Sequence, residues 1–163
     1  MSRWRSPAPK SSPYVTPQGY AALGKELTAL WQKRRGVNDA LSAAAAEGDR
    51  SENAEYIYRK KEQAEIDRRI RYLQKRMPEL KVVDGVGNNA QIFFGATVTL
   101  EQDDGATVTY RIVGPDETDA QKGHISIDSP LAKALLKKQV GDEVTVRVAE
   151  NETTYVLIDI HYS

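Results

Sequence analysis

A repeating pattern of apolar residues constrains the fold of this chain more than any other feature of its sequence. Between residues 20 and 44 the apolar positions are separated by three, four or seven residues: Tyr20, Leu23, Leu27, Leu30, Val37, Leu41 and Ala44. Such a heptad repeat predicts a helix that buries one narrow seam against a partner helix. A second helical pattern runs from Tyr56 to Leu80. Because the connection between the two is short, we expect an antiparallel coiled-coil hairpin.

The connection, "EGDRSENAEY" at residues 47–56, is rich in acidic residues: Glu47, Asp49, Glu52 and Glu55. One interpretation is a capping box, in which Asp49 and Glu52 satisfy amides at the start of the second helix. The other is a pair of hard oxygen ligands for Mg²⁺. With no histidine or cysteine nearby, zinc is disfavoured. The tip also lacks a glycine-rich phosphate loop, so a catalytic role would require a second protein to complete the site.

The rest of the sequence divides into segments of different character. Residues 1–15 are basic and rich in proline and serine, and predict a flexible arm. Residues 16–80 are expected to form the coiled coil. It begins with Thr16 as N-cap, and its acidic tip is at residues 47–55. Residues 81–90 predict a linker. Residues 91–163 alternate apolar and polar positions, as in "TVTYRIV", and contain one short helix that begins after Ser129, which together predict a compact α+β domain.

Charge is distributed unevenly between the halves. Residues 1–80 hold 16 Lys and Arg against 10 Asp and Glu, whereas residues 81–163 hold 7 against 13. The second helix carries the candidate RNA-binding basic patch: Arg59, Lys60, Lys61, Arg68, Arg69, Arg71, Lys75 and Arg76. Such a density of positive charge suits contacts with phosphates, although a solvated helix face has the same composition.

The composition bounds the remaining possibilities. The 163 residues include no cysteine, which removes disulfide and thiolate chemistry. No apolar run approaches the length needed to cross a bilayer, so no membrane partner is expected. These features favour a cytoplasmic protein, and a monomer is the simplest expectation.

Several motifs resemble the bacterial transcript cleavage factors of the GreA/GreB family, in the same order along the chain. They are "TPQGYAAL", the tip motif "GDRSENAEY", "EIDRRIRYL", "FFGATVTLEQDDG", "YRIVGPDE" and "ISIDSPLAKALLKKQVGDEV". Arg50 is similar to the arginine of GreB-type tips. The resemblance covers residues 14–162 and implies an N-terminal antiparallel coiled coil followed by a C-terminal domain of FKBP-like fold.

The same resemblance implies a function and a set of site residues. Members of this family dock at the rim of the RNA polymerase secondary channel and insert the coiled coil into it. The tip then stimulates endonucleolytic cleavage of the 3′ end of backtracked nascent RNA, without being an enzyme on its own. By resemblance, Asp49 and Glu52 are the catalytic residues and share a Mg²⁺ ion with polymerase. Arg50, Ser51, Asn53 and Tyr56 support the tip. The basic patch holds the RNA 3′ segment, and docking involves Ser129, Pro130 and Leu131.

Three other functions remain open at this stage. A non-catalytic protein of related shape could occupy the channel without cleaving RNA. The FKBP-like domain could be a peptidyl-prolyl isomerase, although residues 81–163 contain no tryptophan and their only phenylalanines are Phe93 and Phe94. A simple RNA-binding rod would depend on the basic patch and be indifferent to Asp49.

Overall fold

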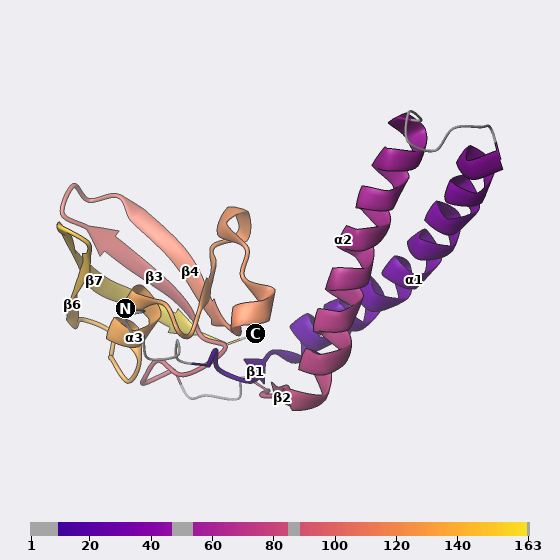
Figure 1. Cartoon of the computed structure of the whole chain (residues 1–163). Coiled ribbons are helices and arrows are strands. Elements are labelled where there is room, and N and C mark those ends of the chain that lie inside the picture. Colours follow the sequence, from indigo (N-terminus) through magenta and orange to yellow (C-terminus); the bar gives the residue numbers. More distant parts are fainter. Residues whose placement is uncertain (1–9, 47–53, 85–88, 163) are drawn as a thin grey trace, which may run out of the picture. The chain divides into compact units, whose positions relative to one another are not determined.

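The computed structural model describes residues 10–46, 54–84 and 89–162. The chain forms two compact units: Tyr20–Leu80, and Met1–Gly19 together with Lys81–Ser163. The first is a helical hairpin and the second is built around a β-sheet (Figure 1). The predicted fold class, a helical hairpin followed by an α+β domain, is confirmed.

The hairpin consists of α1 (Pro17–Ala46) and α2 (Ala54–Arg76), and a 3₁₀ turn, η1 (Met77–Glu79), follows. Two contacts between the helices establish their direction: Arg34 donates to Asp67 at 2.6 Å, and Gln63 donates to Asn38 at 2.6 Å. Residues later in α1 therefore contact residues earlier in α2, which confirms the antiparallel arrangement visible in Figure 1.

The seam between the helices contains most of the predicted apolar positions. Val37 and Leu41 of α1 pack against Ile66 and Ile70 of α2, with less than a tenth of each residue exposed. Leu27, Leu30 and Tyr56 pack around this cluster. Gly36 does not interrupt α1, and a side chain added there would enter open space. The hairpin is thus held together by a narrow apolar seam, as its heptad pattern predicts.

The first turn of α1 is bound within the sheet unit. Thr16 caps the helix, because its hydroxyl oxygen accepts from the Gly19 amide at 3.0 Å. The carboxylate of Glu117 in turn accepts from the Thr16 amide at 2.7 Å, from the Thr16 hydroxyl, and from the Gly114 amide at 3.1 Å. Residues 101 positions apart in the sequence are therefore joined by one buried helix cap.

Five strands of the described chain form the main sheet of the second unit, in the order β5-β4-β3-β7-β6. Their bounds are β3 (Thr97–Gln102), β4 (Thr107–Val113), β5 (His124–Ser126), β6 (Glu143–Val148) and β7 (Asn151–His161). Neighbouring strands are antiparallel except for β4 and β5, which are parallel. Between β3 and β4 the chain turns at Asp103-Asp104-Gly105, with Gly105 at a φ of 82°.

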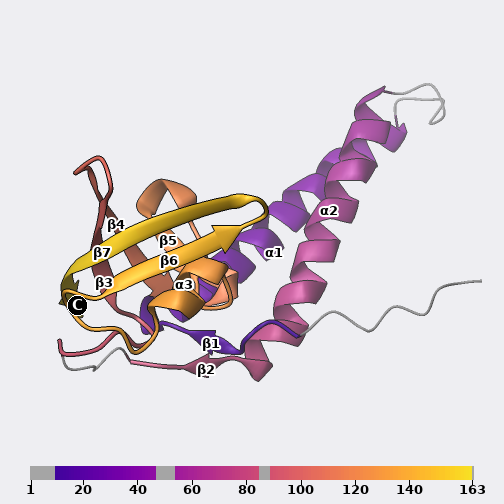
Figure 2. The same cartoon turned by 90° about the vertical axis from the view of Figure 1, so that its left-hand side faces the viewer.

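The core of this unit lies between the sheet and the short helix α3 (Pro130–Leu135) (Figure 2). Val98, Leu100 and Leu157 from the strands are fully buried, as are Ala132 and Leu135 of α3. Two 3₁₀ turns, η2 (Pro115–Glu117) and η3 (Ala120–Lys122), lie between β4 and β5. In β3 the buried Val98 and Leu100 alternate with the half-buried Thr97 and Thr99, which matches the period of two in its sequence.

Two short strands lie in the segments predicted as an arm and a linker. Within the expected arm of residues 1–15, strand β1 (Tyr14–Val15) pairs in parallel with β2 (Lys81–Val82), which lies in the expected linker of residues 81–90. Val15 is fully buried. These two-residue strands are too short to leave a periodic signal, which is why their sequence indicated only an arm and a linker. Within the described ranges, no helix is long and apolar enough to span a membrane.

Candidate nucleic-acid interface

All eight predicted basic-patch residues lie on α2, but the structure separates them into two groups. Five are exposed: Lys60, Lys61, Arg68, Arg71 and Lys75. Among the described residues, no ion pair involves any of these five side chains. Their charges therefore face solvent and are available to a polyanion.

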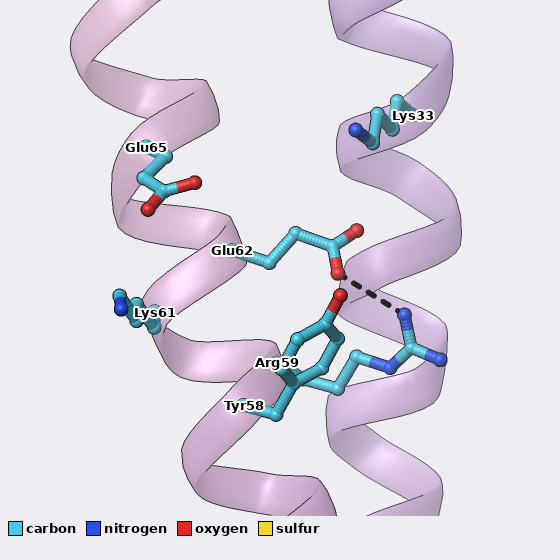
Figure 3. Close-up of a pocket in the computed structure, with 6 residues that line it drawn as sticks. All are labelled: Lys33, Tyr58, Arg59, Lys61, Glu62 and Glu65. Carbon is cyan, nitrogen blue, oxygen red and sulfur yellow. Dashed lines mark hydrogen bonds and ion pairs between the residues drawn. The ribbon is translucent and has the colours of Figure 1, made fainter.

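The other three basic residues are half-buried and form ion pairs. Arg59 contacts Glu55 at 2.9 Å and Glu62 at 3.1 Å, and Figure 3 shows the second of these pairs. The hydrogen bond from Arg59 to Glu55 raises the pKa of its guanidinium group, so this side chain stays protonated. These contacts occur within α2, at spacings of three and four residues.

Arg69 forms its ion pair with the opposite helix. Its guanidinium group donates to both carboxylate oxygens of Glu26 on α1, at 2.9 and 2.8 Å. Arg76 lies 3.9 Å from Glu79. A cation that is already paired offers less to a phosphate than an unpaired one, so Arg59, Arg69 and Arg76 add less to the exposed positive charge than the other five. The composition of α2 does not show which of its cations are paired. The pairing of Arg69 depends on the antiparallel register, which brings it close to Glu26 of α1.

Three arginines of the hairpin stack on exposed aromatic rings. The guanidinium carbon lies 5.8 Å from the ring centre for Arg34 on Trp31, 5.5 Å for Arg59 on Tyr58, and 5.3 Å for Arg69 on Tyr72. These distances are within the range of cation–π contacts. The prediction from sequence assigned no function to Trp31 and did not include Arg34.

The residues predicted at the tip lie largely outside the described part of the chain: Asp49, Arg50, Ser51, Glu52 and Asn53. Tyr56 is described, and it packs half-buried against the seam of the hairpin. The motif spans the junction between the end of α1 at Ala46 and the start of α2 at Ala54. Among the described residues, no group of three or more histidine, aspartate or glutamate side chains could hold a metal. The magnesium ligands remain a prediction.

The predicted docking residues surround the start of α3. The Ser129 hydroxyl oxygen accepts from the Ala132 amide at 3.2 Å and caps the helix. Leu131 packs half-buried against the core of the sheet unit. Pro130 alone of the three is exposed. If this segment contacts a partner, Pro130 is the residue best placed to do so.

Comparison with known proteins identifies the family. The model for the N-terminal domain of transcription elongation factors of this type matches residues 13–82, and the model "Transcription elongation factor, GreA/GreB, C-term" matches residues 87–162. The chain belongs to the GreA/GreB family. The resemblance noted in its motifs is thereby confirmed over nearly the whole sequence.

Curated relatives in this family are similar over the full length. The chain is 57% identical to transcription elongation factor GreB of Xanthomonas axonopodis pv. citri, covering 100% of this chain and 99% of that protein. It is 51% identical to GreB of Pseudomonas aeruginosa, covering 99% and 98%. Among solved structures it is similar to Thermus aquaticus Gfh1, at 24% identity and a TM-score of 0.44, covering 93% of this chain and 99% of that one.

Proposed function

We propose that this protein inserts its hairpin into the secondary channel of bacterial RNA polymerase and stimulates cleavage of the 3′ end of backtracked RNA. One observation carries the proposal: the acidic motif of this elongation-factor family falls at the junction between two antiparallel helices. A thin hairpin that carries two carboxylates at its end can bring them into a narrow channel. The proposed place of action is the cytoplasm.

Asp49 and Glu52 are the proposed catalytic residues. Each offers the hard carboxylate oxygens that Mg²⁺ prefers, and one or two protein carboxylates per ion is the usual number. The proposal requires polymerase to supply the remaining ligands, which makes this protein a contributor to the site rather than an enzyme by itself. Bound there, Mg²⁺ would supply electrostatic stabilisation of the phosphoryl group during hydrolysis. Arg50, Ser51 and Asn53 are proposed to position the two acids.

The exposed cations of α2 are proposed to hold the extruded RNA. Lys60, Lys61, Arg68, Arg71 and Lys75 supply charge without base recognition, so the affinity should depend strongly on salt. Replacing Arg68 and Arg71 with glutamate should weaken rescue of deeply backtracked complexes at low salt. Unchanged rescue at every salt concentration would exclude these residues from the RNA contact.

The decisive experiment uses a backtracked bacterial polymerase complex with end-labelled RNA and Mg²⁺. Wild-type protein should shorten the RNA rapidly, whereas Asp49→Asn and Glu52→Gln should bind polymerase normally and leave the RNA intact. These amides preserve side-chain size, so a loss of cleavage reports the missing charge and metal ligand. If wild type and both variants bind but none shortens the RNA, the protein occupies the channel without cleaving, which is the alternative function.

Docking through the start of α3 can be tested separately. Pro130→Asp changes an exposed residue ahead of the packed positions of α3, and should weaken polymerase binding without reducing stability. The exposed Lys133→Glu change, one turn further along α3, is the matched control for added negative charge. Equal binding by wild type and Pro130→Asp would place the docking surface elsewhere.

A further inference from the structure

Two grooves between the helices lie in line on one side of the hairpin. The first is lined by Trp31 and Arg34 of α1 and by Arg71 of α2, among other residues. The second is lined by Asn38 and Lys60, among other residues. Residues seven apart lie on nearly the same side of a helix, and Trp31 and Asn38 have this spacing. Asp67, in the first groove, is likewise seven residues after Lys60.

We call this side the Trp31 flank and define it by six residues: Trp31, Arg34, Asn38, Lys60, Asp67 and Arg71. The opposite side, the Tyr58 flank, contains the groove of Figure 3, whose lining includes Lys33, Tyr58, Glu62 and Glu65. Arg69, seven residues after Glu62, extends this second flank toward Glu26. The buried Ile66 and Ile70 lie between the two flanks on α2.

The two flanks differ in charge. The Trp31 flank has three cations, Arg34, Lys60 and Arg71, and one carboxylate, Asp67. Asp67 is already engaged by Arg34 at 2.6 Å. The Tyr58 flank carries as many carboxylates as cations, so its net charge is zero against +2 for the Trp31 flank. Its carboxylates are Glu26, Glu55, Glu62 and Glu65, and its cations are Lys33, Arg59, Lys61 and Arg69. Carboxylates repel phosphates, so a single-stranded nucleic acid is favoured on the Trp31 flank.

Trp31 adds a surface on which a base can stack. The residue is 39% exposed, so part of its ring faces solvent. Arg34 lies over the indole at 5.8 Å and is held there by its ion pair with Asp67. An exposed aromatic ring beside free cations is the combination that binds single strands without sequence preference. The exposed Arg71 lines the same groove.

We propose that the Trp31 flank binds the single-stranded RNA 3′ segment, with a base stacked on Trp31 and phosphates held by Lys60 and Arg71. This inference rests on the proposed function, because it assumes that RNA passes along the hairpin. Trp31 precedes Ala46, the end of α1, by fifteen residues, or about 22 Å along the helix. RNA that begins at the tip reaches Trp31 only when the extruded segment is long, so the contribution of Trp31 depends on backtrack length.

The first test measures RNA binding directly, without polymerase. The chain has two tryptophans, so Trp4→Phe leaves Trp31 as the only indole fluorophore. Titration with a single-stranded oligoribonucleotide should quench this fluorescence. Adding Lys60→Ala and Arg71→Ala should weaken binding about tenfold and flatten its salt dependence. Tyr72→Ala, which removes an exposed aromatic ring from the other flank, should change nothing. Absence of quenching at saturating RNA would overturn the proposal.

The second test compares cleavage in complexes with short and long backtracked segments. Trp31→Ala should slow cleavage about fivefold or more on long segments and leave short ones unaffected, while Trp31→Phe should retain most of the activity. Tyr72→Ala is again the matched control. Equal losses on both segment lengths, or weaker binding of Trp31→Ala to polymerase that holds no RNA, would identify a protein contact and overturn the proposal. If the wild-type protein fails to stimulate cleavage, the proposed function is wrong. The fluorescence titration then still shows whether Trp31 binds RNA.

Discussion

At the scale of single residues, the glycines of α1 have opposite roles. Gly36 and Gly24 face open space, whereas a Cβ at Gly19 would overlap Oε1 of Glu117. Glycine in a helix is destabilising relative to alanine because it loses more backbone entropy on folding. Replacing glycine with alanine is therefore expected to have opposite effects at Gly36 and at Gly19, although both lie in α1.

Gly36→Ala should raise the free energy of unfolding by about 0.5–1 kcal/mol, because it restores helix propensity without a clash. Gly19→Ala should lower it, because the added methyl group displaces the Glu117 carboxylate from the Thr16 cap. Urea denaturation followed by circular dichroism measures both changes. A destabilised Gly36→Ala variant would mean that the glycine has a role outside helix propensity.

Tyr162 offers a prediction about pH. Its hydroxyl donates to the Gln91 carbonyl at 2.8 Å and accepts from the Phe93 amide at 2.8 Å. Burial raises the pKa of this phenol above its ordinary value of 10.0. The neutral form is thus favoured in the folded state, and its stabilisation is present below pH 10.0 and is lost as pH rises through the raised pKa.

Tyr162→Phe should lower the free energy of unfolding by about 0.5–1.5 kcal/mol at neutral pH, because two hydrogen bonds are lost. The difference between wild type and variant should shrink in alkaline solution, where only the wild type has this phenol to deprotonate. Urea denaturation across the alkaline range measures the difference. A gap that stays constant with pH would contradict the assignment of this pKa shift.

At the scale of elements, the hairpin depends on a few buried residues. Ile70 of α2 is 4% exposed and packs against α1, whereas Ile57 of the same helix is 55% exposed. Few other contacts can replace Ile70, because two helices alone bury little surface. The positions provide a matched pair within one helix.

Ile70→Ala should destabilise the hairpin by about 2–5 kcal/mol, through lost burial and the cavity that remains. Ile57→Ala should change stability by less than about 0.5 kcal/mol, because its side chain is already in water. The loss of helical circular dichroism on heating measures both. Similar effects at the two positions would show that the seam between α1 and α2 is not what stabilises the hairpin.

At the scale of the whole molecule, residues before the hairpin and residues after it form one compact unit, which contains the main sheet. Strand β1 pairs with β2, and Glu117 accepts hydrogen bonds from Thr16. The start of α1 is therefore fixed by residues that follow it by about a hundred positions. Substitutions at Glu117 should therefore alter the stability of the first turn of α1.

Thr16→Ala and Glu117→Ala should each destabilise the protein, and the double variant should lose less than the sum of the two. The expected coupling is about 0.5–3 kcal/mol, because both changes remove the same hydrogen bonds. Urea denaturation gives the coupling, and hydrogen exchange at the Gly19 amide reports the cap locally. Strict additivity would show that Thr16 and Glu117 act independently.

The sequence by itself determined the elements that depend on local periodicity. The heptad positions predicted the hairpin, alternation predicted β3 and β4, and Ser129 and Thr16 were identified as caps from their neighbours along the chain. Family membership was likewise predictable from its motifs. These features are local, since a few residues in a row carry all the information that they need.

Only the tertiary structure decided what depends on distant partners. The pairing of β1 with β2, the capture of Thr16 by Glu117, and the neutralisation of Arg69 by Glu26 each join separate segments. The same holds for the uneven charge of the two flanks, since each combines side chains from both helices. A charge pattern along one helix shows which residues are cations. Whether a cation is free or paired depends on which helix packs beside it, and in what register.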